Sequence, residues 1–189
     1  MYLCKMAYTE STMLPLGTEA PEFSLPDVVS GNLYSLDQLA SKKATVIMFI
    51  CNHCPYVIHV LPEMIKLAQD YKSRDVAFVA ISSNDAIRYP DDAPDKMKIK
   101  AKSMNFPFVY LYDETQAVAK SYDAACTPDF YLFDGSRKLV YRGRLDQSKP
   151  KNDLPLNGQD LRRALDQVLS GFPVSEKQYP SAGCSIKWK

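Results

Sequence analysis

The chain has 189 residues with 46% hydrophobic and 24% charged side chains, and its formal net charge is +1. This hydrophobic share can fill a sizeable core, and the length suits one domain. Positive and negative side chains are nearly balanced, without a long run of either sign, so neither a nucleic-acid partner nor an anionic membrane surface is expected.

The N-terminal residues and the cysteine count indicate the compartment. Residues 1–17 lack the apolar segment of a secretory signal, and no stretch approaches the roughly 18 apolar residues that span a bilayer. The cysteines number five, an odd count that suits a reducing compartment better than a secreted scaffold. We therefore expect a cytoplasmic protein without a membrane partner, in which Cys4 is an exposed or loosely packed terminal thiol.

The first half of the chain predicts an extension followed by a strand, a helix and a second strand. Residues 1–20 form a polar N-terminal extension, and the prolines and Ser-Gly turn of 21–40 favour a small hairpin and a helical turn. The continuous apolar run 44–50 is typical of a strand covered on both faces. Apolar residues recur every three or four positions over 54–72, which predicts an amphipathic helix, and 76–82 is a second buried strand parallel to the first.

The second half predicts further helices and strands and a terminal tail. Residues 83–96 are acidic and rich in turn formers, and we interpret 89–96 as a solvated insertion. Asp134-Gly135 is a strong hairpin signal, so 129–143 should form antiparallel strands on the edge side of the sheet. The other predicted elements are a short helix at 97–104, a strand at 106–113, a helix at 114–124, a closing helix at 157–171 and a tail at 173–189.

The motif Cys51-Asn52-His53-Cys54 lies between the strand at 44–50 and the helix that follows it. Unpaired amides in the first turn of a helix, together with the helix dipole, stabilise negative charge on a nearby sulfur. We expect this effect at the first sulfur, which makes Cys51 the candidate nucleophile.

The sequence resembles the thioredoxin-fold redoxins, in the peroxiredoxin-like branch of the alkyl-hydroperoxide-reductase and thiol-specific-antioxidant group. The segments that carry the resemblance are "GTEAPEFSLPDV", "FICNHCPYV", "VAFVAISSND", "CTPDFYLFD" and "GCSIKWK". The resemblance implies a single α/β domain over 1–189 with the thioredoxin fold: a central mixed sheet flanked by helices, with an N-terminal extension or hairpin. It also implies that Thr127-Pro128 is a cis peptide that faces the dithiol and binds the extended backbone of a substrate.

The resemblance implies a thiol-disulfide oxidoreductase acting on protein or small-molecule disulfides and thiols, with no cofactor and no metal. Cys51 attacks the substrate disulfide, and Cys54 attacks the resulting mixed disulfide. Asn52 and His53 would tune the pair, since a cationic imidazole beside Cys51 stabilises its thiolate and raises the reduction potential. We expect a potential less reducing than the value of about −270 mV for thioredoxin.

Three other interpretations stay open. A thiol peroxidase acting on peroxide would use Cys54 as the peroxidatic residue, although Cys51 then replaces the usual threonine of the motif and Pro128 stands where an arginine is expected. A zinc site lacks a second ligand pair at compatible spacing, and a non-catalytic redox-sensing module would oxidise without turnover. Cys126 and Cys184 are either accessory thiols or packed core residues. The sequence carries no signal for an oligomeric state.

Overall fold

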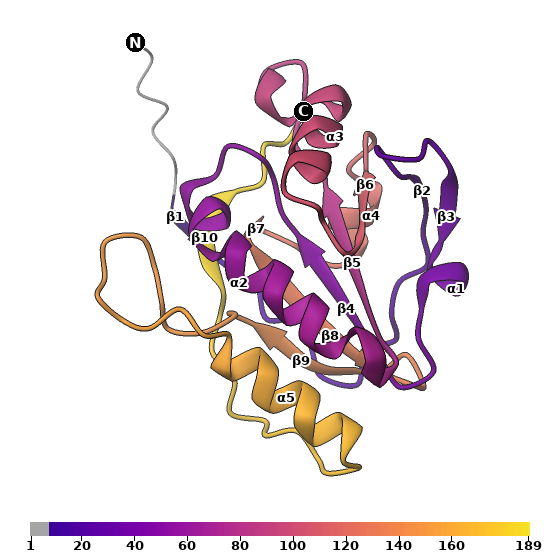
Figure 1. Cartoon of the computed structure of the whole chain (residues 1–189), viewed down its shortest axis with the longest axis vertical. Helices are drawn as coiled ribbons and strands as arrows, with labels where there is room; N and C mark the ends of the chain where they lie inside the picture. Colours follow the sequence, from indigo (N-terminus) through magenta and orange to yellow (C-terminus); the bar gives the residue numbers. More distant parts are fainter. Residues whose placement is uncertain (1–7) are drawn as a thin grey trace.

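A five-stranded mixed sheet forms the centre of the protein in the computed structural model, which describes residues 8–189 (Figure 1). Its strand order is β6-β5-β4-β8-β9; β4, β5 and β6 run parallel, and β8 is antiparallel to both of its neighbours. The bounds of the strands are β4 Ala44–Phe49, β5 Val76–Ser82, β6 Val109–Tyr112, β8 Asp129–Asp134 and β9 Leu139–Gly143. The predicted α/β class and the central place of the apolar strand are confirmed.

Helices cover both faces of this sheet, because successive side chains of each strand point to opposite sides. In β4, Val46 and Met48 pack with α2 and α5, whereas Ile47 and Phe49 join the cluster that includes α1 and α4. The helices are α1 Leu36–Leu39, α2 Pro55–Tyr71, α3 Pro94–Ser103, α4 Ala117–Ser121 and α5 Gln159–Leu169, with short 3-10 turns at Lys72–Arg74 and Pro90–Asp92. Within residues 8–189, no helix has the length and apolar character to cross a bilayer.

The segment before β4 forms the expected hairpin and helical turn. Strands β2 (Ser24–Pro26) and β3 (Leu33–Ser35) pair antiparallel, and α1 follows directly. Ser35 and Gln38 cap α1 reciprocally, each side chain accepting the other's backbone N–H, which is the capping-box arrangement. The predicted terminal position of Cys4 lies outside the described residues.

A second, three-stranded sheet joins segments that are far apart in the sequence. Its order is β1 (Tyr8–Glu10), β10 (Ala182–Ser185) and β7 (Cys126–Thr127), with antiparallel pairing throughout. In Figure 1, β1, β10 and β7 lie beside the start of α2. Part of the predicted tail is therefore a strand, and it runs beside the Thr127-Pro128 peptide, which is cis as expected.

Candidate active site

The dithiol lies between the end of β4 and the start of α2, and the helix begins later than predicted. Cys54 is the N-cap of α2 and Pro55 occupies the first turn, where its fixed φ suits a helix and its missing N–H costs nothing. Among the helix amides, that of Val57 favours the Cys54 thiolate, although the Cys54 side chain makes no capping hydrogen bond of ordinary geometry. The prediction that the helix start stabilises the Cys51 thiolate is therefore wrong, because Cys54 receives this stabilisation.

Cys54 is the thiol whose anion is favoured. Its pKa is lowered because the side chains of Cys184 and Cys51 hydrogen-bond to its sulfur, and the backbone amide of Val57 adds a further donor. These donors outweigh burial, which alone would raise the pKa. The carbonyl of Thr127, 3.1 Å from the sulfur, can accept only from the protonated thiol and so opposes the anion without reversing the balance.

Cys51 has the opposite environment. Its pKa is raised well above the ordinary value, first because its thiol is hydrogen-bonded to Cys54, then because the sulfur is buried, and then because the negative charge of Asp92 is nearby. The hydroxyl of Thr127 lies 3.4 Å from the sulfur and favours the anion weakly. In the reduced pair, the proton is therefore on Cys51, and the Cys51 thiol donates a hydrogen bond to the Cys54 sulfur.

Asp92 is a site residue that the sequence analysis missed. The sequence predicts a solvated insertion at 89–96, but the Asp92 side chain is fully buried. One carboxylate oxygen accepts the backbone N–H of Asn52 at 2.7 Å, and the other accepts the side-chain amide of Asn84 at 2.7 Å. Asp92 thus ties the 3-10 turn Pro90–Asp92 to the loop between the two cysteines.

His53 pairs with Asp92. Its Nδ1 lies 2.7 Å from the Asp92 carboxylate, and its ring stacks on Tyr89 with centroids 5.6 Å apart and planes inclined by 6°. The Asp92 carboxylate raises the pKa of His53. The carboxylate beside the imidazole raises the pKa of Cys51, which opposes the effect expected of a cationic His53, so the tuning role of His53 stays a prediction.

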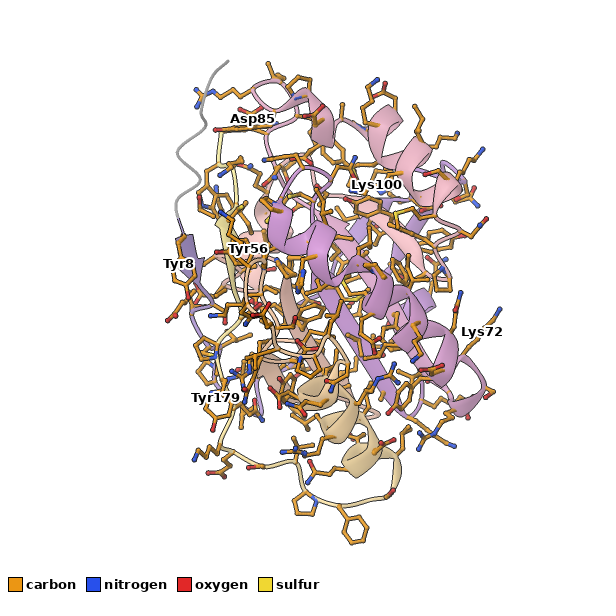
Figure 2. All side chains as sticks on the ribbon, turned by 60° about the vertical axis from the view of Figure 1, so that its left-hand side comes forward. Tyr8, Tyr56, Lys72, Asp85, Lys100 and Tyr179 are labelled. Atoms are coloured by element: carbon orange, nitrogen blue, oxygen red, sulfur yellow. The ribbon has the colours of Figure 1, made fainter. Side chains whose placement is uncertain are left out.

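Asn52 holds the loop in place from several sides. Its carbonyl accepts from Lys100 Nζ at 2.7 Å, and its side chain donates to the carbonyl of Asp91 at 2.8 Å and accepts from the Tyr110 hydroxyl at 3.3 Å. Lys100 comes from α3 and is labelled in Figure 2. Burial lowers the pKa of this lysine. No local pattern in the sequence indicated these partners.

The backbone of Thr127 is not a free edge. Strand β10 pairs with β7 so that Cys184 lies opposite Thr127 and Ser185 lies opposite Cys126. The prediction that Thr127 offers its backbone to a substrate strand is therefore contradicted in this structure, since the chain's own strand occupies that position. Pro128 remains beside the thiols and lines a small pocket with Tyr56 and Lys149.

The accessory thiols lie in different places. Cys126 is fully buried, its sulfur is 3.7 Å from the carbonyl of Pro128, and burial raises its pKa. Cys184 is also buried, but its side chain contacts Cys54. Among the four described cysteines, three thus form a connected group.

Aromatic side chains border the site near the start of α2. The rings of Tyr8 and Tyr56 are 6.4 Å apart, and both are labelled on the same side of the molecule in Figure 2. The ammonium group of Lys149 lies 5.7 Å from the centre of the Tyr8 ring. Strand β1, which carries Tyr8, therefore lies next to the first turn of α2, which carries Tyr56 and follows the dithiol.

One group of side chains could offer ligands to a metal ion. The sulfur of Cys51, a ring nitrogen of His53 and a carboxylate oxygen of Asp92 all lie within 4.8 Å of one another. A structural zinc site takes four ligands, and both oxygens of Asp92 already accept hydrogen bonds from Asn52 and Asn84. We assign no metal to this group.

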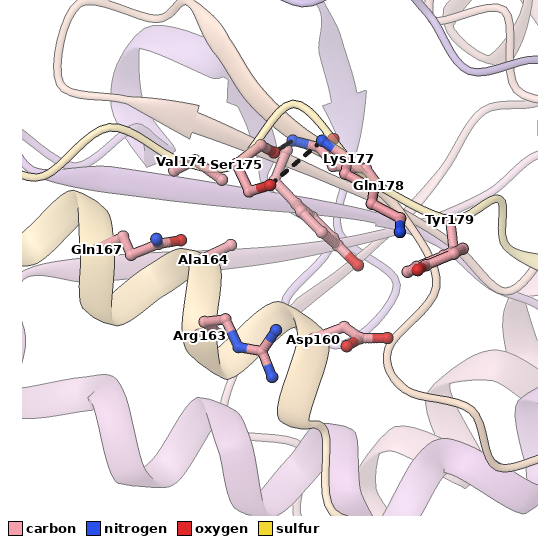
Figure 3. Close-up of a pocket in the computed structure, with 10 residues that line it drawn as sticks. Asp160, Arg163, Ala164, Gln167, Val174, Ser175, Lys177, Gln178 and Tyr179 are labelled. Atoms are coloured by element: carbon pink, nitrogen blue, oxygen red, sulfur yellow. Dashed lines mark hydrogen bonds between the residues drawn. The ribbon is translucent and has the colours of Figure 1, made fainter.

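A separate pocket lies between α5 and the segment 174–179 (Figure 3). The side chains of Asp160, Arg163 and Gln167 line it from the helix. Within the opposite segment, the backbone N–H of Lys177 bonds to the Ser175 hydroxyl, and the Gln178 amide donates to the Ser175 carbonyl. No cysteine lines this pocket, so it is not part of the thiol site.

Comparisons with known proteins give a family and a set of similar structures. The redoxin family model matches residues 15–156. An uncharacterized conserved protein from Geobacillus kaustophilus is 59% identical, with a TM-score of 0.96 and 97% of each chain covered. A hypothetical protein from Sinorhizobium meliloti is 44% identical, with a TM-score of 0.93 and coverage of 96% of this chain and 98% of that one.

A thiol:disulfide interchange protein of the thioredoxin family from Chlorobium tepidum is 20% identical, with a TM-score of 0.62 and coverage of 81% of this chain and 97% of the other. At this identity the likeness concerns the fold alone. A comparison with curated proteins finds no match.

Proposed function

Since the chain belongs to the redoxin family of thioredoxin-fold thiol oxidoreductases, we propose that it exchanges disulfides through the dithiol of Cys51 and Cys54. The observation that carries this proposal is the direct contact of the two thiols beside the cis Thr127-Pro128 peptide. The substrates are protein or small-molecule disulfides and thiols. We also propose a cytoplasmic location, where thiols are kept reduced.

The shared proton gives each thiol a role. When a disulfide RSSR approaches, the proton of Cys51 passes to the Cys54 thiolate, and the Cys51 sulfur attacks one sulfur of RSSR and expels RS⁻. Cys54 then gives its proton to RS⁻ and attacks the Cys51 sulfur, which releases the second RS⁻. Two electrons leave the protein and one intramolecular disulfide forms.

Hydrogen bonding supports Cys51 as the attacking sulfur. Both thiols are buried, but Cys51 lies beside the hydroxyl of Thr127, which can donate to its thiolate. Because β10 closes the edge of Thr127, small disulfides should react faster than folded protein substrates. The recognition of a long extended peptide would need β10 to move.

The test is the turnover of an insulin-type protein disulfide and of a small aromatic disulfide, with a thiol reductant, by wild type, Cys51→Ser and Cys54→Ser. Both variants should lose turnover by a factor on the order of 1,000 or more. Cys126→Ser is the matched control, since its sulfur bonds to the carbonyl of Pro128 and not to the dithiol, and it should retain turnover. Undiminished turnover by Cys51→Ser would contradict the proposal.

A second candidate function is a thiol peroxidase, and the position of Cys54 at the N-cap of α2 favours it. The Cys54 thiolate would attack the O–O bond of a hydroperoxide, so that a sulfenic acid forms and hydroxide or alkoxide leaves. Cys51 would then attack the sulfenic sulfur, which releases water and forms the disulfide. Peroxide consumption by Cys51→Ser for a single turnover, with none by Cys54→Ser, would support this function.

A further inference from the structure

Strand β10 places a third cysteine against the dithiol. It lies between β1 and β7, with Gly183 opposite Thr9 and Cys184 opposite Thr127. A Cβ at position 183 would lie 2.0 Å from the carbonyl oxygen of Thr127, so only glycine lets the strand come this close. The backbone of β10 is therefore held against the residue that touches both Cys51 and Cys54.

The side chains of Cys51, Cys54 and Cys184 form a connected row. Cys54 is in the middle, in side-chain contact with Cys51 on one side and with Cys184 on the other. The exposed fraction of Cys184 is 1%, so its thiol faces the interior rather than solvent. Cys126 lies outside this row, because its sulfur points to the carbonyl of Pro128.

We propose that Cys184 is a third redox-active thiol, which forms a disulfide with Cys54. The proposal deepens the proposed function and rests on it, because the substrate disulfide of that function oxidises the dithiol. In the oxidised protein, the Cys184 sulfur attacks the Cys54 sulfur, the bond between Cys51 and Cys54 breaks, and Cys51 leaves as a thiolate that takes the proton of Cys184. No net oxidation or reduction occurs in this step.

The isomerised form differs from the first disulfide in two ways. Cys51 becomes a thiol again and is available for a second reaction. Strand β10 becomes covalently attached to the N-cap of α2, which fixes it over Thr127. Cys184 thus couples the oxidation state of the dithiol to the attachment of the C-terminal strand.

The experiment is disulfide mapping of Cys51→Ser after oxidation with diamide, by alkylation of remaining thiols, proteolysis under non-reducing conditions and mass spectrometry. The expected result is an intramolecular linkage of the peptides that carry Cys54 and Cys184. Cys51→Ser/Cys126→Ser should give the same linkage, and Cys51→Ser/Cys184→Ser should give none. Cys54 and Cys184 both alkylated after diamide treatment, or linked only between molecules, would overturn the proposal.

Wild type provides the second measurement in case the variants fold poorly. After diamide treatment it should contain both the Cys51–Cys54 and the Cys54–Cys184 linkage, whereas a Cys51–Cys54 linkage alone would overturn the proposal. Diamide supplies the oxidising equivalents, so the mapping does not need substrate turnover. Loss of the proposed disulfide-exchange activity would appear in the turnover assay and not in this map, which keeps the two failures distinguishable.

Discussion

Nδ1 of His53 lies 2.7 Å from the carboxylate of Asp92, which is fully buried beside the dithiol. The Asp92 carboxylate disfavours a thiolate at Cys51 and favours the cationic form of the His53 imidazole. The charge balance of the site is therefore set by a carboxylate 38 positions beyond Cys54 as much as by the residues between the cysteines.

The exchange Asp92→Asn should lower the pKa of His53 and also that of Cys51, because the carboxylate raises both. The free energy of unfolding should fall by about 1–3 kcal/mol, since charged hydrogen bonds to Asn52 and Asn84 are lost. NMR titration of the imidazole and denaturant unfolding measure these effects. Asp91→Asn is the control, because Asp91 contacts Asn52 through its backbone carbonyl; an equal change there would contradict the assignment.

The first thiolate of the reduced protein should belong to Cys54, because the side chains of Cys184 and Cys51 donate to its sulfur. Ultraviolet thiolate absorbance should persist well below the ordinary cysteine pKa of about 8.5 in wild type and in Cys51→Ser. It should disappear from that pH range in Cys54→Ser. If Cys51→Ser were the variant that lost the absorbance, Cys51 would carry the thiolate instead.

Burial raises the pKa of Asp129 to about 8 from its ordinary value of 3.8, although the Tyr131 hydroxyl and the Phe130 amide oppose the shift. Between pH 3.8 and about 8, Asp129 is therefore protonated in the native state and ionised in the unfolded chain. Because the native state binds the additional proton, the free energy of unfolding falls as the pH rises through this range. Asp129→Asn should remove this fall. Unfolding by denaturant at several pH values tests it.

The control for this titration is Asp153→Asn, whose side chain is exposed. It should keep the pH dependence of wild type. The quantity to compare is the unfolding free energy of wild type minus that of Asp129→Asn. If this difference stayed constant or rose over the same pH range, Asp129 would be ionised in the native state.

Arg162 joins α5 to α2 through a nearly buried carboxylate. Its Nη2 and Nε lie 2.6 and 3.0 Å from Glu63 Oε1, and Nη1 lies 2.8 Å from Asp70. Arg162→Ala leaves the Glu63 charge without this partner, so the unfolding free energy should fall by about 3–5 kcal/mol. Arg163→Ala, at an exposed neighbouring position, should change it little.

A second substitution separates the charge effect from lost packing. Adding Glu63→Gln to Arg162→Ala should recover part of the lost stability, because the unpaired buried charge disappears. If the double variant were no more stable than Arg162→Ala, the loss would come from packing of the arginine side chain. Thermal or denaturant unfolding of the four proteins gives the comparison.

The sequence predicted the central sheet well because its signals are local. The apolar run before Cys51, the periodicity over α2 and the Asp134-Gly135 turn each depend on neighbouring residues. The start of α2 was placed one residue early, although Pro55 was a usable signal for a first-turn position with Cys54 as the N-cap.

The parts that were missed depend on contacts between distant segments. Asp92 is bonded to the amide of Asn52 at a separation of 40 residues, and nothing in its acidic surroundings distinguishes it from the exposed Asp91. Strand β10 is short and composed of small residues, and its pairing with β1 and β7 is set only in three dimensions. The thiol contacts of Cys184 followed from that pairing and could not be predicted without it.

The pairing of β10 with Thr127 also has a consequence for synthesis on the ribosome. Synthesis begins at the N-terminus, so β4, α2 and the Thr127-Pro128 peptide leave the ribosome before residues 182–185. During this interval the nascent chain carries a dithiol whose neighbouring strand edge is still open. The thiols of a partly synthesised chain should therefore react faster with oxidants than those of the finished protein, and the closing strand marks the end of that exposure.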